Sequence, residues 1–221
     1  ETLSEAPESI FTHDTRSELS SRHAWGDFNN DGFEDVFTSG KLHENQGDGT
    51  FLDVTETTGI AGLDLVASGG IWGDYDNDGY LDLFVFAESG TAQDTLLRND
   101  GLGSFIDMTV LANLDDTQTE NSCGGTATTR PTAGAAWWDI NGDGFLDLYQ
   151  SNFICWSEWT FYMDTVYMNN GDGSFSDVSG QNGFFTRAFS GRGANPADAD
   201  NDGDVDLLVN NYTLHRNLFF K

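Results

Sequence analysis

The stretch from Trp72 to Phe84, "WGDYDNDGYLDLF", places Asp74, Asp76, Asp78 and Asp82 within nine residues. Two like charges about 4 Å apart repel by roughly 4 kcal/mol at an effective dielectric near 20, and this stretch would hold several such pairs. We therefore expect a cation among these side chains.

The same nine-residue pattern, D-x-[DN]-x-D-G-x-x-D, occurs four times in the chain. The other copies are "WGDFNNDGFEDVF" from Trp25, "WWDINGDGFLDLY" from Trp137 and "PADADNDGDVDLL" from Pro196. Four copies of one pattern indicate a repeat protein, and self-similarity of this kind decides the fold.

A second motif follows each of the first three copies. It reads "NQGDGTFLDVT" from Asn45, "NDGLGSFIDMT" from Asn99 and "NNGDGSFSDVS" from Asn169. The repeat unit is therefore two motifs long. We expect one repeat domain over residues 1–221, with repeats at approximately 11–50, 51–104, 105–174 and 175–221.

The segments beside the motifs are short, rich in Phe, Tyr, Val, Leu and Trp, and bounded by Gly, Asn and Asp. This pattern is typical of strands of 4 to 6 residues, and no segment has a convincing helical period. Strand-rich units of roughly 40 to 70 residues are typical of propeller blades. The sequence predicts an all-β fold, a β-propeller of four blades that are four-stranded antiparallel sheets, with Trp25, Trp72 and Trp137 packed between blades.

The nine-residue loop has the chemistry of a metal site. Counted from Asp74 as position 1, side-chain oxygens come from positions 1, 3, 5 and 9. Gly79 at position 6 permits a sharp turn, and Tyr80 at position 7 offers its backbone carbonyl. Calcium takes 6 to 8 oxygen ligands of this kind, whereas magnesium keeps more water. The alternative is a set of solvated turns without metal.

Each loop offers five such residues. The predicted ligands are Asp27, Asn29, Asp31, Phe33 and Asp35; Asp74, Asp76, Asp78, Tyr80 and Asp82; Asp139, Asn141, Asp143, Phe145 and Asp147; and Asp198, Asp200, Asp202, Asp204 and Asp206. About four Ca²⁺ ions would change the formal charge from −28 to −20.

The charge balance restricts the partners. With 37 acidic and 9 basic residues, the chain lacks the clustered Lys and Arg that nucleic acids and anionic membranes require. No apolar run approaches the roughly 20 residues of a transmembrane segment. The two cysteines, Cys123 and Cys155, have no C-x-x-C spacing, so we predict a disulfide in an oxidising compartment. Two reduced, buried thiols are the alternative.

The motifs "WGDYDNDGYLDLF", "LLRNDGLGSF" and "FLDVTETTGI" resemble FG-GAP/VCBS repeats, the calcium-loop blades of integrin α-chain heads. They are most similar to the variety in cartilage acidic protein and related bacterial secreted proteins. The resemblance implies calcium loops between the first and second strands of each blade, and a secreted, extracellular protein. Because propellers of this family usually have seven blades, a partial arc is the alternative to four-bladed closure.

The last blade lacks an obvious outermost strand. Near the start, "FTHDT" at residues 11–15 loosely resembles "FLDVT" and "FIDMT". We predict that this N-terminal segment completes the last blade, either within one chain or from a neighbouring copy. Exchange of the strand between copies would produce an oligomer or a fibre.

The third repeat contains two long connections, at about residues 111–136 and 150–164, which we expect on the face opposite the calcium loops. The second connection is rich in aromatic residues, and such rings suit sugars or a partner protein. The candidate ligand face comprises Phe153, Trp156, Trp159, Phe161 and Tyr162. The alternative is that these rings pack beneath the insertion.

We interpret the chain as a calcium-stabilised structural, adhesion or protein-interaction module, with other proteins, glycans or copies of itself as partners. A lectin that uses the aromatic insertion is the second interpretation. An accessory domain of a polysaccharide-degrading enzyme is the third. No nucleophile, base and orienting group occur together, so we do not expect an enzyme. Asn211 begins "NYT", which is an N-glycosylation sequon.

Overall fold

The computed structural model describes residues 22–115, 129–156, 159–181, 184, 188–213 and 215–221. The predicted all-β fold is confirmed: four antiparallel sheets follow one another along the chain, one for each copy of the nine-residue pattern. We call these sheets the first to fourth blades. The helical structure among the described residues is the short 3-10 helix η1 (Ile60–Leu63).

The strands of the first two blades pair in chain order. The first blade contains β1 (Ala24–Gly26), β2 (Asp35–Thr38), β3 (Lys41–Asn45) and β4 (Phe51–Asp53). The second contains β5 (Gly69–Gly73), β6 (Asp82–Phe86), β7 (Thr95–Asn99) and β8 (Phe105–Asp107).

The third blade carries an additional hairpin. Its sheet contains β9 (Thr132–Trp138), β10 (Asp147–Asn152), β13 (Thr165–Asn169) and β14 (Phe175–Asp177). The hairpin is formed by β11 (Ile154–Cys155) and β12 (Thr160–Phe161). The fourth blade has three described strands, β15 (Gly191–Ala197), β16 (Asp206–Asn211) and β17 (Leu218–Phe220).

The outermost strand of each complete blade lies just past the end of the predicted repeat. For example, β4 starts at Phe51, whereas we placed the first repeat at approximately 11–50. The predicted N-terminal strand, residues 11–15, lies outside the described residues. Whether it completes the fourth blade or exchanges between copies therefore stays a prediction.

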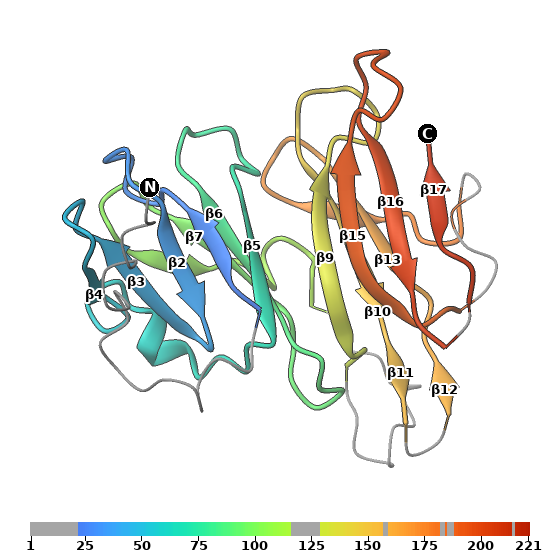
Figure 1. Cartoon of the computed structure of the whole chain (residues 1–221), viewed down its shortest axis with the longest axis horizontal. Coiled ribbons are helices and arrows are strands. Elements are labelled where there is room, and N and C mark those ends of the chain that lie inside the picture. The colour runs from blue at the N-terminus through green and yellow to red at the C-terminus, as the bar shows by residue number, and fades with distance from the viewer. Residues whose placement is uncertain (1–21, 116–128, 157–158, 182–183, 185–187, 214) are drawn as a thin grey trace, which may run out of the picture.

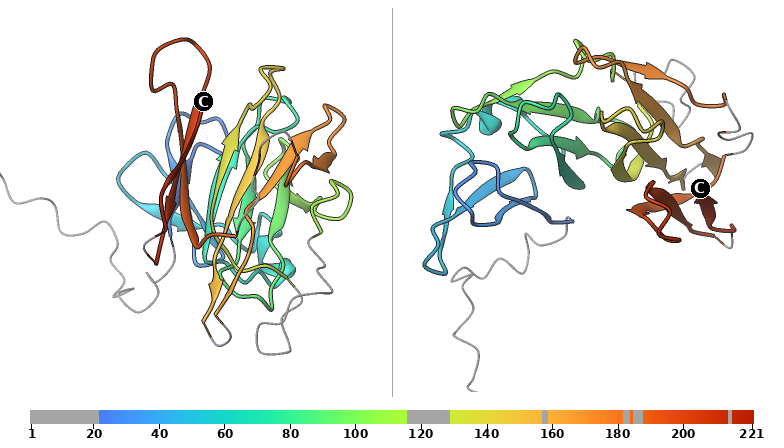
Figure 2. Two further views of the ribbon diagram at one scale, coloured as in Figure 1. Left: turned by 90° about the vertical axis from the view of Figure 1, so that its right-hand side faces the viewer. Right: turned by 90° about the horizontal axis from the view of Figure 1, so that it is seen from above.

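The blades stand side by side in chain order (Figure 1). Seen from above, the described sheets follow an open arc, with the first and fourth blades at its two ends (Figure 2). The first strands β1, β5, β9 and β15 line the inside of the arc, each next to the one before it. The described residues thus form propeller-like blades arranged in an arc.

Two of the three predicted inter-blade tryptophans pack as expected. Trp72 stacks on Phe28 of the first blade, and Trp137 stacks on Tyr75 of the second, with ring centroids 6.5 and 6.4 Å apart. The expectation for Trp25 is wrong, because this side chain is 52% exposed. It lies on the face of the first blade that is turned away from the second blade, where no described blade covers it.

A glycine of the preceding blade makes room for each packed tryptophan. A Cβ on Gly26 would lie 2.7 Å from the Trp72 ring, and one on Gly73 would lie 2.4 Å from the Trp137 ring. The third blade has Trp138 in place of this glycine. Trp138 is buried against the fourth blade, which correspondingly has Pro196 where the earlier blades have tryptophan. At this interface the packed tryptophan comes from the third blade and not from the fourth, so a tryptophan still fills the space between the two blades.

Candidate functional site

The four predicted loops connect the first two strands of each blade, and those of the third and fourth blades lie together at the upper end of the sheets in Figure 1. In each loop the aspartate at position 1 accepts hydrogen bonds from later backbone N–H groups. Asp74 Oδ1 accepts from Asp78 N and Oδ2 from Gly79 N, both at 3.0 Å. Gly79 has φ +93°, a left-handed conformation that glycine adopts without strain. The predicted sharp turn at position 6 is therefore present.

The aspartate at position 9 is buried and holds the loop to the sheet. Asp82 Oδ2 accepts from Tyr75 N at 3.2 Å, and Oδ1 accepts from Asn99 N at 2.9 Å. Asp35 and Asp147 make the equivalent pair of bonds. Each of these carboxylates thus joins position 2 of its loop to the end of the third strand of its sheet. This pair of bonds fixes the loop on the sheet.

Burial of these carboxylates is electrostatically unfavourable. Desolvation raises the pKa of Asp82 to about 8, and the charges of Asp76 and Asp78 add to the effect. Burial likewise raises the pKa of Asp35 and Asp147 to about 6, against the hydrogen bonds that lower it. A cation beside these groups would favour their charged forms, because an opposite charge within about 4–6 Å stabilises a carboxylate.

The second loop brings three carboxylates together. Oxygens of Asp74, Asp76 and Asp78 all lie within 4.8 Å of one another. Asp76 Oδ1 is buried and has no hydrogen-bond partner among the described residues, and burial raises the pKa of Asp76. An unpartnered buried carboxylate oxygen beside two further carboxylates fits a hard cation that takes oxygen ligands.

The fourth loop brings together Asp198, Asp200 and Asp206, again within 4.8 Å. Asp206 Oδ1 is also buried and has no hydrogen-bond partner in the described part of the chain. Lys221 Nζ pairs with Asp200 and lies 3.9 Å from Asp202. A basic side chain thus already lies among these carboxylates, as expected for a group of acidic residues that attracts a cation.

The first and third loops have asparagine at position 3. Asn29 Nδ2 donates to Asp31 Oδ2 at 3.1 Å, and Asn141 Nδ2 donates to Asp143 Oδ2 at 2.8 Å. Their amides therefore face the position-5 carboxylates, where the predicted ligand oxygens lie. Whether positions 1, 3, 5 and 9 of these two loops bind calcium stays a prediction.

Position 7 has the same backbone arrangement in all four loops. The N–H of each position-7 residue donates to the carboxylate at position 5, at 2.9 to 3.3 Å. The residues are Phe33, Tyr80, Phe145 and Asp204. This bond fixes the peptide just before the carbonyl that we predict as a ligand; the ligand role of that carbonyl stays a prediction.

The structure assigns a role to the asparagine that begins the second motif. Asn99 Nδ2 donates to Leu81 O of its own loop at 3.2 Å and to Phe28 O of the first loop at 2.7 Å. Asn169 does the same for the third and second loops. Sequence reasoning missed these residues, although the recurrence of asparagine at this place was a usable signal.

A second link joins the loops through position 4. Asn30 Nδ2 donates to Gly79 O at 3.0 Å, and Asn77 Nδ2 donates to Gly144 O at 3.1 Å. The third loop has Gly142 at this position, which offers no side-chain donor. The first three loops therefore form one hydrogen-bonded series, and side-chain bonds of this type do not extend it to the fourth.

The predicted ligand face is only partly exposed. Trp156 and Trp159 are 48% and 64% exposed, whereas Phe153 is buried beneath them. Phe161 packs on the cluster around Phe153 and faces His215, at 5.1 Å between ring centroids. The hairpin that carries these residues lies at the end of the sheets opposite the loops of the third and fourth blades (Figure 1).

The same cluster includes residues that the sequence did not suggest. Tyr212 of the fourth blade is 50% exposed and lies 6.1 Å from Trp156 between ring centroids. Arg192 stacks its guanidinium 3.9 Å from the centre of the Phe153 ring. Tyr162 is half-buried within the hairpin region. Trp156 thus contacts Trp159, Tyr212 and Phe153, and Arg192 stacks on Phe153.

Two further predictions remain open. Cys155 is buried at the end of β11, but Cys123 lies outside the described residues, so the disulfide stays a prediction. Asn211 Nδ2, the atom that glycosylation would modify, donates to Arg216 O at 2.8 Å. Glycosylation at Asn211 likewise stays a prediction.

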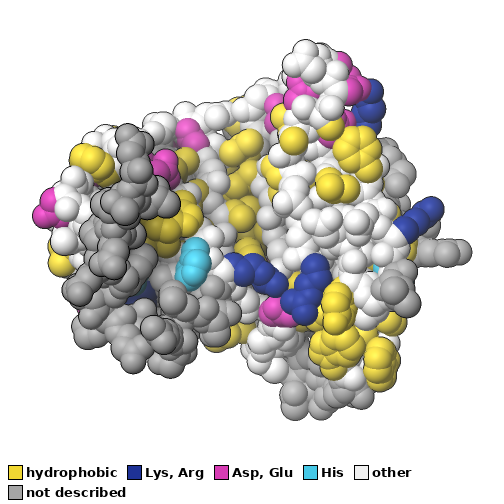
Figure 3. Space-filling view, viewed as in Figure 1, with side chains coloured by type: hydrophobic (Ala, Val, Ile, Leu, Met, Phe, Trp, Pro, Cys, Tyr) yellow, Lys and Arg dark blue, Asp and Glu magenta, His cyan; other side chains and the backbone are white. Residues whose placement is uncertain are grey.

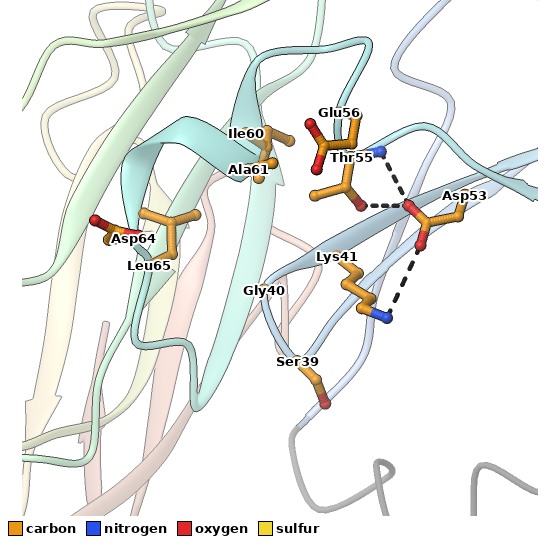
Figure 4. Close-up of a pocket in the computed structure, with 10 residues that line it drawn as sticks. All are labelled: Ser39, Gly40, Lys41, Asp53, Thr55, Glu56, Ile60, Ala61, Asp64 and Leu65. Carbon is orange, nitrogen blue, oxygen red and sulfur yellow. Dashed lines mark hydrogen bonds and ion pairs between the residues drawn. The ribbon is translucent and has the colours of Figure 1, made fainter.

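An open hollow of about 630 Å³ lies on the first blade, beside η1 (Figure 4). Lys41 Nζ lies 3.9 Å from Asp53 Oδ2, and Asp53 Oδ1 accepts hydrogen bonds from Thr55. These polar groups bind one another and do not point together into the hollow. The hollow includes none of the predicted site residues, and we assign it no function.

The four antiparallel sheets and their acidic loops define a protein built of propeller-like blades. The family model described as FG-GAP-like repeat matches residues 27–85, 74–150 and 152–209, so the chain belongs to this family. No curated protein is similar enough in sequence to count as a relative. Among the described residues, no helix has the length and apolar character needed to cross a membrane.

Two solved structures are similar in part. One describes the specific recognition of non-reducing terminal N-acetylglucosamine by an Agrocybe aegerita lectin: identity is 18%, the TM-score is 0.46, and the match covers 86% of this chain and 48% of that one. The other is the V. cholerae biofilm matrix protein Bap1: identity is 16%, the TM-score is 0.43, and coverage is 87% and 35%. This chain therefore spans less than half the length of either.

Proposed function

We propose that this chain is a calcium-stabilised extracellular binding module, in which metal ions clamp the first hairpin of each blade. The buried carboxylates carry this proposal, above all Asp82, whose two oxygens are both held by backbone N–H groups. Beside it, Asp74, Asp76 and Asp78 place three more carboxylates within one loop. A divalent cation would offset the repulsion among these carboxylates and hold each loop on its sheet.

Binding rather than catalysis is the proposed role. The repeated aspartates hydrogen-bond to the backbone of their own loops, which suits a structural clamp. We propose other proteins or glycans as partners, on a surface away from the loops. Self-assembly by strand exchange and a role as accessory domain of a polysaccharide-degrading enzyme are further predictions, and they depend on parts of the chain or of a larger protein that lie outside the described residues.

A thermal melt with and without a chelator tests the proposal. A ligand that binds only the folded state stabilises it by RT ln(1 + [L]/Kd), or about 2.7 kcal/mol at 100 times Kd. We expect excess chelator to lower the melting temperature and added calcium to restore it, with magnesium less effective. Asp82→Asn should weaken the calcium response, whereas Asp100→Asn, at a partly exposed position of the second motif, should leave it intact. An unchanged melt would contradict the proposal.

A further inference from the structure

The inside of the arc contains a group of charged residues from three blades. Glu88, which follows β6, binds Arg192 of β15 at 2.8 Å and Arg22, which precedes β1, at 3.4 Å. Two guanidinium groups therefore share one carboxylate, and all three side chains are partly exposed. In a chain of net charge −28, this group is locally positive.

Arg192 connects this group to the exposed aromatic rings. Its guanidinium lies 3.9 Å from the centre of the Phe153 ring and 5.5 Å from that of Tyr212. Trp156 contacts both of these rings, at 5.8 and 6.1 Å between centroids, and Trp159 at 5.5 Å. Figure 3 shows apolar side chains gathered beside basic and acidic ones at this end of the third and fourth blades. We call Trp156, Trp159, Tyr212, Arg192 and Glu88 the aromatic platform.

The rings of the platform stand edge to face. The interplanar angles are 82° between Trp156 and Tyr212 and 81° between Trp156 and Trp159. In this arrangement the edge of one ring lies against a face of the next, and each side chain is still about half exposed or more. The face of an aromatic ring carries partial negative charge and attracts C–H groups of partial positive charge.

The area of the platform favours a small ligand over a protein. An aromatic side chain has a surface of about 200 Å². Three such side chains, each about half exposed, therefore offer roughly 300 Å² of exposed surface to a ligand. A stable protein interface buries about 800 Å² on each partner. The platform alone is too small for such an interface, but it matches one or two sugar rings.

We propose that the aromatic platform binds a pyranose sugar. The apolar C–H face of the ring would pack on Trp156 and Trp159, while its hydroxyls would bond to Arg192 and Glu88. Arginine donates through a rigid fork of N–H groups and the carboxylate accepts, so the pair can bind neighbouring hydroxyls. This inference rests on the proposed binding function and names its ligand class.

The test uses the full chain in saturating calcium. Methyl pyranosides of glucose, galactose, mannose, N-acetylglucosamine and glucuronate are screened by saturation-transfer NMR, and the strongest is titrated by calorimetry. We expect at least one to bind, with saturation strongest at the ring C–H protons. Trp156→Ala and Trp159→Ala should each weaken binding about tenfold, as expected for loss of one stacked ring. Glu88→Gln should weaken it less.

Trp25→Ala is the matched control, because Trp25 is similarly exposed but lies on the first blade. Melting curves verify that each variant is folded. The proposal is overturned if no pyranoside binds the folded wild-type chain, if both platform variants bind as well as wild type, or if Trp25→Ala loses binding equally. If the chain binds no sugar but a chelator lowers its melting temperature, only the sugar site is rejected. If the chain binds sugar but a chelator leaves its melting temperature unchanged, only the calcium clamp is rejected.

Discussion

Asn77 Nδ2 donates a hydrogen bond to Gly144 O at 3.1 Å, and so joins the second acidic loop to the third. If the bond forms only when both loops are ordered, its free energy is shared between the two proposed calcium sites. Calcium binding at one loop should then favour binding at the next.

Asn77→Gly should uncouple these two loops. Glycine occupies the same position in the third loop and tolerates the positive φ of Asn77, which is 58°. Loss of about 1 kcal/mol should weaken calcium binding at the affected sites roughly fivefold. Calcium calorimetry measures this. Asn201→Gly is the control, because Asn201 has a φ of 60° and no hydrogen-bond partner among the described residues. Equal effects of both variants would contradict the coupling.

Asn169→Ala should destabilise the chain more than Asn45→Ala. Asn169 Nδ2 donates to Tyr75 O of the preceding blade and to Leu146 O, so its loss leaves two carbonyls unpaired. Asn45 Nδ2 donates only to Glu34 O, at an exposed site. Leaving buried groups unpaired costs about 1–3 kcal/mol each. Urea denaturation in calcium compares the two variants, and the reverse order would refute the inter-blade role of Asn169.

Gly73→Ala should disturb the interface between the second and third blades. The new Cβ would lie 2.4 Å from the Trp137 ring, and overpacking of this kind costs about 1–3 kcal/mol. Gly193→Ala, also on a first strand, places its Cβ in open space and should be nearly neutral. Thermal melts at fixed calcium make the comparison. If Gly73→Ala melted like wild type, the packing of tryptophan on glycine would not be the device that spaces the blades.

Asp164 should make the chain less stable as the pH rises from about 4 to 7. It is buried, accepts from Tyr149 Oη at 2.6 Å and from Asn152 N at 2.7 Å, and burial raises its pKa to about 7. The unfolded chain releases this proton near pH 4, whereas the folded chain keeps it up to pH 7. The resulting loss of stability is complete above pH 7, and it is absent below the pKa that Asp164 has in the unfolded chain.

Asp164→Asn removes this pH dependence. In saturating calcium, its stability relative to wild type should rise by on the order of 4 kcal/mol between pH 4 and pH 7, and then level off. Denaturant titrations across this range measure the difference. Tyr149→Phe removes a hydrogen bond that lowers the pKa, so it should extend the window to higher pH. A constant difference between Asp164→Asn and wild type would show that Asp164 does not titrate in this range.

The blades and loops could be predicted because the sequence repeats them. Asp82 and its equivalents recur at a fixed distance from Asp74 and its equivalents, and the spacing of a loop is a local property. The environment of Trp25 could not be predicted in this way. It has the same sequence context as Trp72, but Trp72 has a blade in front of it and Trp25 has none among the described residues.

The aromatic platform was predictable only in part. Trp156 and Trp159 belong to one insertion, and their aromatic character was visible in the sequence. Tyr212 and Arg192 come from the fourth blade and Glu88 from the second, so only the arrangement of the blades brings them to the same place. Phe161 is an aromatic residue of the same insertion as Trp156, but it packs on the buried cluster around Phe153.

The number of calcium ions that each chain binds shows whether the acidic loops are metal sites. Native mass spectrometry of the intact chain, titrated with calcium and then treated with chelator, gives this number. We expect about four ions per chain, and one fewer after Asp82→Asn. A chain that binds no calcium, or that binds the same number after Asp82→Asn and Asp147→Asn, would contradict the assignment of these loops as metal clamps.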